Sequence, residues 1–167
     1  MSEAAEPVVI DRANLDDLDG IVALLTLLTE RHLSFHEAFV PIGDWRGGLR
    51  RHLAERIGSS EHLIMVARAA RRPVGLITAT IRLSVVFGAS TRGLLENLVV
   101  LEGWRRRGIG RRLVSAAAMW CETHGAEALE MAVAVRNEEA LAFWRAVGFE
   151  PVLTWLYGPV REGNNRE

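Results

Sequence analysis

The sequence predicts a single domain of the mixed α/β class. Apolar patterns typical of strands and of helices alternate from residue 8 to residue 160, in a chain of 167 residues. The clearest case covers residues 94–121, where a continuous apolar run is followed by apolar residues at helical spacing. A hydrophobic content of 49% with 25% charged residues suits one folded core. We therefore expect one domain over residues 8–160, with flexible ends at residues 1–7 and 161–167.

The first part of the chain is expected to be a strand followed by helices. Residues 8–12 have the pattern of a short strand. Asn14 and Asp17 form a variant of the capping box, so a helix with an apolar stripe should follow them. A short helix is predicted after Ser34, and another at residues 45–57, where apolar residues are spaced by four.

Most of the strands are predicted in the second part of the chain. Apolar runs place them at residues 63–68, 74–86, 94–100, 128–135 and 151–160, with a loop at residues 88–93.

Two further helices interrupt these strands. The first starts at the Gly108–Gly110 pair and is expected to end at Gly125. The second runs from Asn137 to Gly148, after which Phe149 is expected to pack back on the helix as in a Schellman motif.

The segment between the apolar strand and the long helix carries the strongest functional signal. Two glycines let the backbone approach a ligand, and the free amides and dipole of the helix start favour an anion. Positive charge surrounds them, from Arg105, Arg106, Arg107, Arg111 and Arg112. This pattern predicts a pyrophosphate site, although a solvated turn or a nucleic-acid footprint also fits the arginines. It is not a Rossmann fingerprint, because position 113 is Leu, and no Gly-Lys-Ser/Thr of a P-loop follows.

Composition excludes several other classes. A net charge of -1 disfavours a general nucleic-acid binder, and the five histidines show no metal-ligand spacing. No apolar run reaches the ~20 residues that cross a bilayer, and the first residues do not resemble a secretory signal. The single cysteine, Cys121, cannot form an internal disulfide and falls among apolar helix positions, so we expect it in the core. These observations predict a cytoplasmic protein without metal, nucleic acid or membrane as a partner.

Two blocks of this sequence resemble the GNAT acetyltransferase superfamily. The first runs from Arg105 to Gly110 and is similar to the Arg/Gln-x-x-Gly-x-Gly/Ala loop, which in that family holds the pyrophosphate of acetyl-CoA. The second runs from Asn137 to Phe149 and is similar to the family pattern N-x-x-A-x-x-F/L-Y-x-x-x-G-F. The resemblance covers roughly residues 62–155. It implies a twisted, mostly antiparallel sheet of roughly six to seven strands, with about four helices on its two faces and splayed strands at the acetyl-CoA site.

The resemblance also implies which residues meet acetyl-CoA, the expected co-substrate. They lie on the apolar strand, the arginine loop and the last helix: Leu98, Val99, Val100, Arg105, Arg106, Arg107, Gly108, Ile109, Gly110, Arg111, Asn137, Phe143 and Trp144. One backbone amide of residues 98–100 is expected to stabilise the oxyanion. Asn137 has two compatible roles, as a helix cap and as a contact for the pantetheine arm.

Glu96 is the predicted general base. It lies two residues before Leu98, so both side chains should share one face of the strand. Burial on an apolar strand should raise its pKa, which suits a base; the alternatives are an ion pair with an arginine and a cap on a backbone group. The usual tyrosine of the family, a general acid, is replaced here by Trp144, whose indole cannot transfer a proton. The remaining choices are Tyr157, or a thiolate that leaves without a protein acid.

The acceptor site is implied to lie on the first helices, their connection and the loop at residues 87–92. Its candidate residues are His32, Phe35, His36, Phe39 and Trp45, although the aromatic ones also fit a core. They favour an amine with an apolar or flat part, and the acidic cluster that an aminoglycoside would need is missing. We expect a small-molecule primary amine. A protein lysine or N-terminus, a non-catalytic CoA-binding module and a homodimer all stay open.

Overall fold

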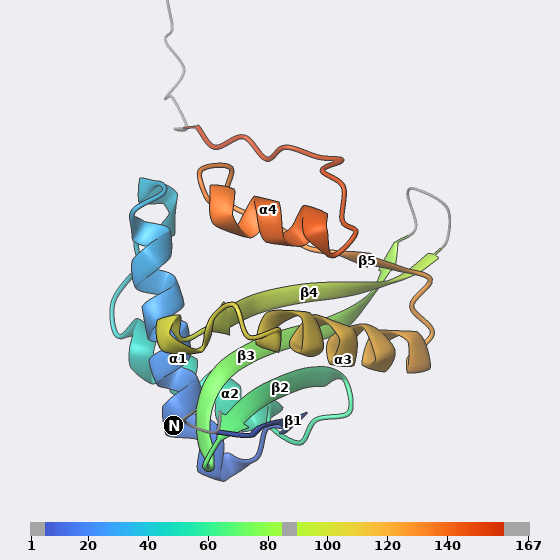
Figure 1. Cartoon of the computed structure of the whole chain (residues 1–167). Coiled ribbons are helices and arrows are strands. Elements are labelled where there is room, and N and C mark those ends of the chain that lie inside the picture. Colours follow the sequence, from blue (N-terminus) through green and yellow to red (C-terminus); the bar gives the residue numbers. More distant parts are fainter. Residues whose placement is uncertain (1–5, 85–89, 159–167) are drawn as a thin grey trace, which may run out of the picture.

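The computed structural model describes residues 6–84 and 90–158, which form a twisted sheet with helices on both faces (Figure 1). Five strands lie in chain order across the sheet: β1 (Val8–Arg12), β2 (His62–Ala69), β3 (Arg72–Ser84), β4 (Ser90–Val100) and β5 (Ala128–Glu130). The first four are antiparallel to their neighbours, whereas β5 is parallel to β4. The predicted mixed α/β class and the mostly antiparallel sheet are confirmed.

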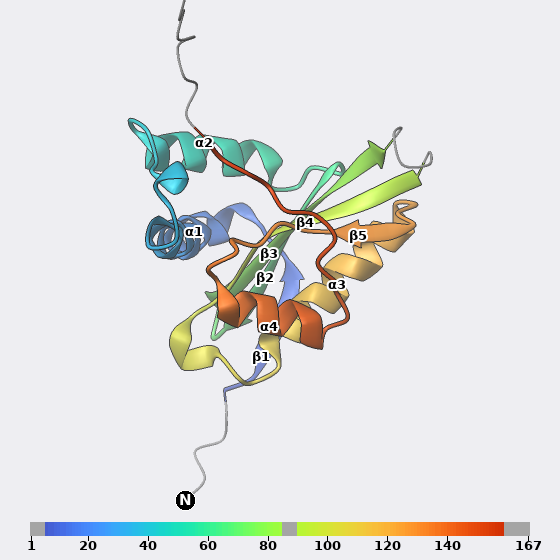
Figure 2. The ribbon, with the colours of Figure 1, turned by 90° about the horizontal axis from the view of Figure 1, so that it is seen from above.

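Four helices cover the sheet. They are α1 (Leu18–Leu33), α2 (Trp45–Arg56), α3 (Ile109–Thr123) and α4 (Glu138–Ala146), with short 3-10 turns at Leu15–Asp17, Glu37–Phe39 and Glu102–Trp104. Seen from above, α1 and α2 lie on one side of the sheet, and α3 and α4 on the other (Figure 2). Each side has its own apolar core, one under α1 and α2 and a larger one under α3 and α4.

The described residues contain fewer strands than the six to seven expected. Residues 151–158 form no strand; they run from α4 towards α2 with exposed apolar side chains (Figure 2). The predicted strand at 128–135 ends at Glu130, so Val135 is exposed while Met131 and Val133 still pack on the core. Apolar alternation makes a strand only where a neighbour supplies hydrogen bonds, and none of the described strands pairs with these residues.

The loop expected at residues 88–93 is also shorter than predicted, because β4 begins at Ser90. Residues 85–89 lie outside the described part of the chain, as do residues 1–5 and 159–167, where most of the predicted flexible ends fall.

The helix ends agree well with the sequence. Gly125 and Gly148 both adopt the left-handed conformation that closes a Schellman motif. At the end of α4 the Phe149 amide donates to the Trp144 carbonyl at 3.0 Å, and the two rings meet edge to face at 4.9 Å. Ser34 does not start a helix as predicted. It ends α1 instead, and the side chain of His36 caps the following 3-10 turn.

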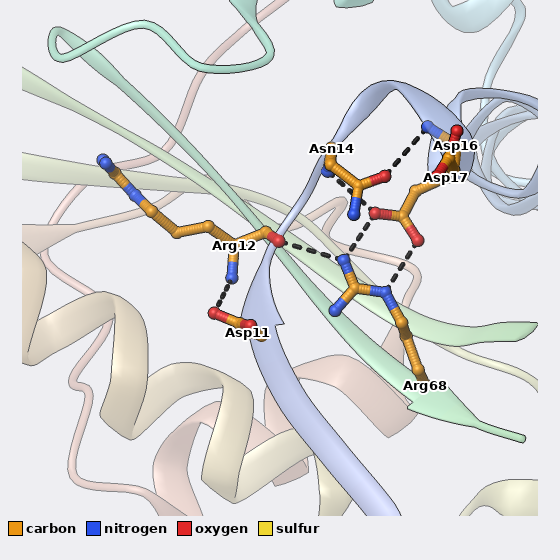
Figure 3. A network of polar contacts seen from close by, with 6 residues as sticks. All are labelled: Asp11, Arg12, Asn14, Asp16, Asp17 and Arg68. Atoms are coloured by element: carbon orange, nitrogen blue, oxygen red, sulfur yellow. Dashed lines mark hydrogen bonds and ion pairs between the residues drawn. The ribbon is translucent and has the colours of Figure 1, made fainter. Parts of the chain in front are cut away.

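A polar network ties the start of α1 to the sheet (Figure 3). The buried carboxylate of Asp17 accepts two hydrogen bonds from Arg68 on β2, at 2.7 and 2.5 Å, and one from the Asn14 amide at 2.8 Å. Burial by itself raises the pKa of Asp17, but these hydrogen bonds and the Arg68 charge outweigh it and hold that pKa below its usual 3.8. The predicted capping box is confirmed, and its acidic member is also an ion-pair partner.

Replacing Arg68 by Met is expected to lower the free energy of unfolding by about 3 kcal/mol, because it leaves Asp17 charged, buried and unpaired. A carboxylate whose pKa is lower in the folded than in the unfolded protein contributes its full stabilisation when the pH is above the unfolded-state pKa. That stabilisation is lost as the pH falls through the folded-state pKa. The difference from the unmodified protein should therefore shrink below pH 3.8. Urea denaturation at several pH values measures this difference in the free energy of unfolding.

Arg50→Met is the control for this prediction. It breaks an exposed ion pair with Asp19 and should lower the free energy of unfolding by about 1 kcal/mol or less. Equal losses in the two variants would contradict the prediction.

Candidate functional site

Strands β4 and β5 separate after three paired positions, from Arg92–Ala128 to Leu94–Glu130. Beyond them β4 continues to Val100, while residues 131–136 leave the sheet. The Leu101 amide donates to Val74 on β3, so strand alternation directs the backbone groups of Val100 away from β3 and into the opening. The separation matches the splayed strands that the sequence predicted, with half-buried Leu98, Val99 and Val100 along one side.

The start of α3 presents free amides next to this opening. Gly108 is the N-cap residue, and no side chain caps the helix there. Among residues 6–84 and 90–158, no backbone or side-chain acceptor is found for the amides of residues 106–111. A helix of 15 residues adds the positive end of its dipole at the same point. This combination favours an anion.

The two glycines of this loop are required for different reasons. Gly108 has a φ of +76° and open space where a Cβ would be, so its conformation is the constraint. At Gly110 a Cβ would lie 3.2 Å from the ring of Phe143, so the close packing of α4 is the constraint. The sequence argument assigned both glycines to ligand approach. At Gly110 the nearby ring of Phe143 is a second reason for the absence of a side chain.

Arg105 anchors the loop to its surroundings. Its Nε donates to the Val100 carbonyl at 3.1 Å, and its Nη1 lies 3.6 Å from Glu139 on α4. Glu139 also pairs with Arg31 of α1 at 2.5 Å, which links both helix layers around the opening. Arg105 therefore has a structural role, which the sequence pattern did not reveal.

The other arginines are more exposed. Arg107 lies over the ring of Trp104 at 4.8 Å, and Arg106 has a φ of +62°. Arg112 donates to the Val8 carbonyl at 2.9 Å, across to β1. The exposed arginines nearest in sequence to the free amides are Arg106, Arg107 and Arg111.

A β-bulge in β4 changes the position of Glu96. The pairing register with β3 shifts between Leu76 and Thr78, and Asn97 takes a φ of +57° with its Nδ2 donating to Thr78 Oγ1 at 2.9 Å. An extra residue reverses the alternation of side chains. Leu98 accordingly packs in the core under α3, whereas Glu96 lines a pocket on the α1 and α2 side. The prediction that these two side chains share a face is wrong.

Glu96 is also exposed, so the burial that the sequence argument assumed is not found. Among the described residues Glu96 forms no ion pair, and its carboxylate accepts no backbone hydrogen bond, so neither alternative role is found there.

The pocket on this side has a volume of about 450 Å³ and lies between α1, α2 and the sheet. Of the predicted acceptor residues it contains His32 and Trp45. Phe35 and Phe39 pack against the His32 ring at 5.9 and 5.3 Å and so support the wall from outside. Of the predicted stretch at residues 87–92, residues 90–92 do not line the pocket, and residues 87–89 lie outside the described part of the chain.

Sequence reasoning missed most of the polar lining of the pocket. These residues are Thr29, His52, Arg56, His62, Thr78, Thr80, Arg82 and Asn97. The signal was present in β3, where Thr78, Thr80 and Arg82 alternate with apolar residues, as in a strand with one face in the core and one open.

Two of the pocket histidines are neutral at neutral pH. Burial lowers the pKa of His32, and the charge of Arg31 adds to this. Burial also lowers the pKa of His52, as does the charge of Arg56, which contacts its ring. Both imidazoles can therefore donate or accept a hydrogen bond to a bound molecule.

The remaining predicted residues lie on the α4 side or on the C-terminal segment. Asn137 caps α4 through Ala140, as predicted, with an N–O distance of 3.2 Å. Trp144 is buried edge-on between Phe143 and Phe149. The exposed Tyr157 ring meets His36 at 5.4 Å, and neither residue lines the pocket.

Cys121 is fully buried in α3 and burial raises the pKa of its thiol, so the predicted core position is confirmed. None of the helices in the described ranges is long and apolar enough to cross a membrane. The described residues also hold no group of three or more side chains placed to bind a metal ion.

Comparison with known proteins places these features in a family. The family model "Acetyltransferase (GNAT) family" matches residues 24–149. Aminoglycoside N(6')-acetyltransferase type 1 of Acinetobacter haemolyticus is 26% identical over 118 residues, which is 68% of this chain and 81% of that protein. The enzyme of the same name from Salmonella typhimurium LT2 is 30% identical over 104 residues, or 59% and 72% of the two chains. The uncharacterized N-acetyltransferase YobR of Bacillus subtilis is 32% identical over 76 residues, and this chain spans 30% of its length.

Solved structures share the fold at lower identity. Aminoglycoside N-acetyltransferase AAC(6')-Iy in complex with CoA has a TM-score of 0.78 at 21% identity, covering 96% of this chain and 99% of that one. A transcriptional regulator from Bacillus halodurans C-125 has a TM-score of 0.75 at 22% identity, covering 92% and 99%.

Proposed function

Because the chain belongs to the GNAT acetyltransferase family, we propose that it transfers the acetyl group of acetyl-CoA to a primary amine of a small molecule. One observation carries the proposal: β4 connects the three parts that the reaction needs. Its residues from Leu95 to Val100 border the opening beside β5, its end leads to the free amides of α3, and its Glu96 lines the pocket.

Acetyl-CoA is proposed to bind along this opening. The free amides from Gly108 to Arg111 would hold the pyrophosphate, which is supported by the fact that none of them has an acceptor among the described residues. The pantetheine arm would follow the backbone of β4, where the Val100 amide faces the opening and the Val100 carbonyl accepts from Arg105. Phe143 packs at the start of α3 and Asn137 begins α4, so both are proposed to border the arm on its other side.

The chemical step requires a neutral amine and a stabilised oxyanion. We assign the first task to Glu96, which takes the proton of the ammonium directly or through water. The amine nitrogen then forms a bond to the thioester carbon, and a backbone amide of residues 98–100 stabilises the oxyanion. The C–S bond breaks, the bonded nitrogen releases its extra proton to solvent to leave the neutral amide, and the CoA thiolate takes a proton from solvent. This last assignment is preferred to Tyr157, because Tyr157 does not line the pocket that contains Glu96.

The proposal is tested by mixing the purified protein with acetyl-CoA and a panel of primary amines and measuring free thiol. Acetyl-CoA-dependent thiol release, with a product heavier by one acetyl group, is the expected result. The relatives make aminoglycosides a second acceptor class for the panel. Tight CoA binding without thiol release from any amine would favour a non-catalytic CoA-binding module. Absence of CoA binding would exclude both functions.

A further inference from the structure

The charged side chains that line the acceptor pocket are mostly cationic. Two guanidinium groups, those of Arg56 and Arg82, line it together with one carboxylate, that of Glu96. Neither arginine forms an ion pair with an acidic side chain of residues 6–84 or 90–158.

Two of the four arginines of α2 are paired with acidic residues of α1: Arg46 with Glu30 at 3.2 Å, and Arg50 with Asp19. These pairs do not line the pocket, whereas Arg56, at the end of the helix, does. The pocket therefore has positive charge that the described protein does not neutralise, and like charges inside a partly enclosed site are unfavourable to a polycation.

The positive charge lies at the opposite end of the pocket from the proposed base. Glu96 pairs in register with Thr78, and Arg82 lies four residues further along the same strand, about 13 Å away. His62 pairs with Thr80, and β2 starts there, just after α2 ends at Arg56. Arg56, His62 and Arg82 therefore belong to one end of the pocket, and Glu96 to the other.

We infer that the acceptor is an amine that also carries an oxyanion, a carboxylate or a phosphate, held by Arg56 and Arg82 while its amine reaches Glu96. This inference rests on the proposed acetyl transfer and names the substrate class for it. Guanidinium groups bind both oxyanions with paired hydrogen bonds, and Thr80 and His62 add polar groups beside them. A polycationic aminoglycoside would bring ammonium groups to the same arginines.

A series of amines that differ only in the end group tests the inference. The series is 6-aminohexanoate, 6-aminohexyl phosphate, the neutral 6-aminohexanamide and the cationic hexane-1,6-diamine, with the aminoglycoside neamine beside them. The carboxylate or the phosphate should exceed the amide by about tenfold in kcat/KM, and the diamine should be poorer still. The better of the two anionic arms identifies the oxyanion. Calorimetry in the presence of CoA measures the same order in affinity, so the result does not depend on turnover.

Variants assign the effect to the two arginines. Arg56→Gln and Arg82→Gln should each reduce the preference for the anionic amine over the amide to about twofold. Arg46→Gln is the matched control, because it removes a charge from the same helix outside the pocket and should keep the preference. Preference for the diamine or neamine, no binding of any member of the series, or an unchanged ratio in both pocket variants would overturn the inference. Each of these results is distinct from failure of the proposed function, in which no acetyl group reaches any amine.

Discussion

Replacing Glu96 by Gln is expected to lower kcat for acetyl transfer by about 100-fold, because glutamine cannot accept the proton of the attacking amine. CoA affinity should stay within about twofold, since Glu96 lies on the pocket side of the bulge and not on the free amides of α3. Steady-state thiol release gives kcat, and calorimetry with CoA gives the affinity.

A conservative variant separates a base from a side chain that only shapes the pocket. Glu96→Asp should recover part of the rate, because it keeps the carboxylate. Glu102→Gln, an exposed residue in the turn after β4, is the control and should leave the rate unchanged. Near-normal turnover in Glu96→Gln would remove Glu96 from the mechanism.

Replacing Gly108 by Asp is expected to weaken CoA binding by about 100-fold, equivalent to about 2.7 kcal/mol. The added carboxylate would lie beside the free amides at the start of α3, in the open space next to Gly108, and would repel the pyrophosphate. The effect should diminish in high salt, because screening weakens the repulsion between exposed charges. Calorimetric titration with CoA at two salt concentrations measures both quantities.

Gly108→Asn is the matched control for this prediction. Asparagine has the same shape as aspartate and tolerates the positive φ of +76° equally well, but it carries no charge. It should therefore weaken CoA binding far less, while both variants keep a similar melting temperature. Gly125→Asp places the same change at a similar φ of +81° at the far end of α3 and should leave CoA binding unchanged. Equal losses for Asp and Asn at Gly108 would show that backbone strain, and not charge, limits binding.

Local chemistry explains where sequence reasoning succeeded. A helix cap or a C-terminal glycine acts on backbone groups within a few residues, so Asn14, Gly125 and Gly148 were assigned correctly. The pyrophosphate loop has the same local character, because glycine, arginine and helix start are adjacent in the chain. The strand predicted at residues 151–160 is not found over residues 151–158, because strand pairing depends on a distant partner, which no local pattern reveals.

The face to which Glu96 points was decided only by the tertiary structure. Alternation from Leu98 placed the carboxylate on the α3 side, but a single extra residue at Asn97 reverses it and turns Glu96 to the acceptor pocket. An asparagine following a glutamate inside an apolar strand was a visible hint, since asparagine tolerates positive φ. Its meaning depended on the register with β3.

By itself, the sequence determined the mixed α/β class, the family, and the loop from Arg105 to Gly110, because each depends on residues that are neighbours in the chain. Only the tertiary structure decided which side chains share the pocket with Glu96. Arg56 and Arg82 are 26 positions apart and come from a helix and a strand. Folding alone brings both of them to the lining of one cavity, whose charge is the property by which we infer that an acceptor amine is selected.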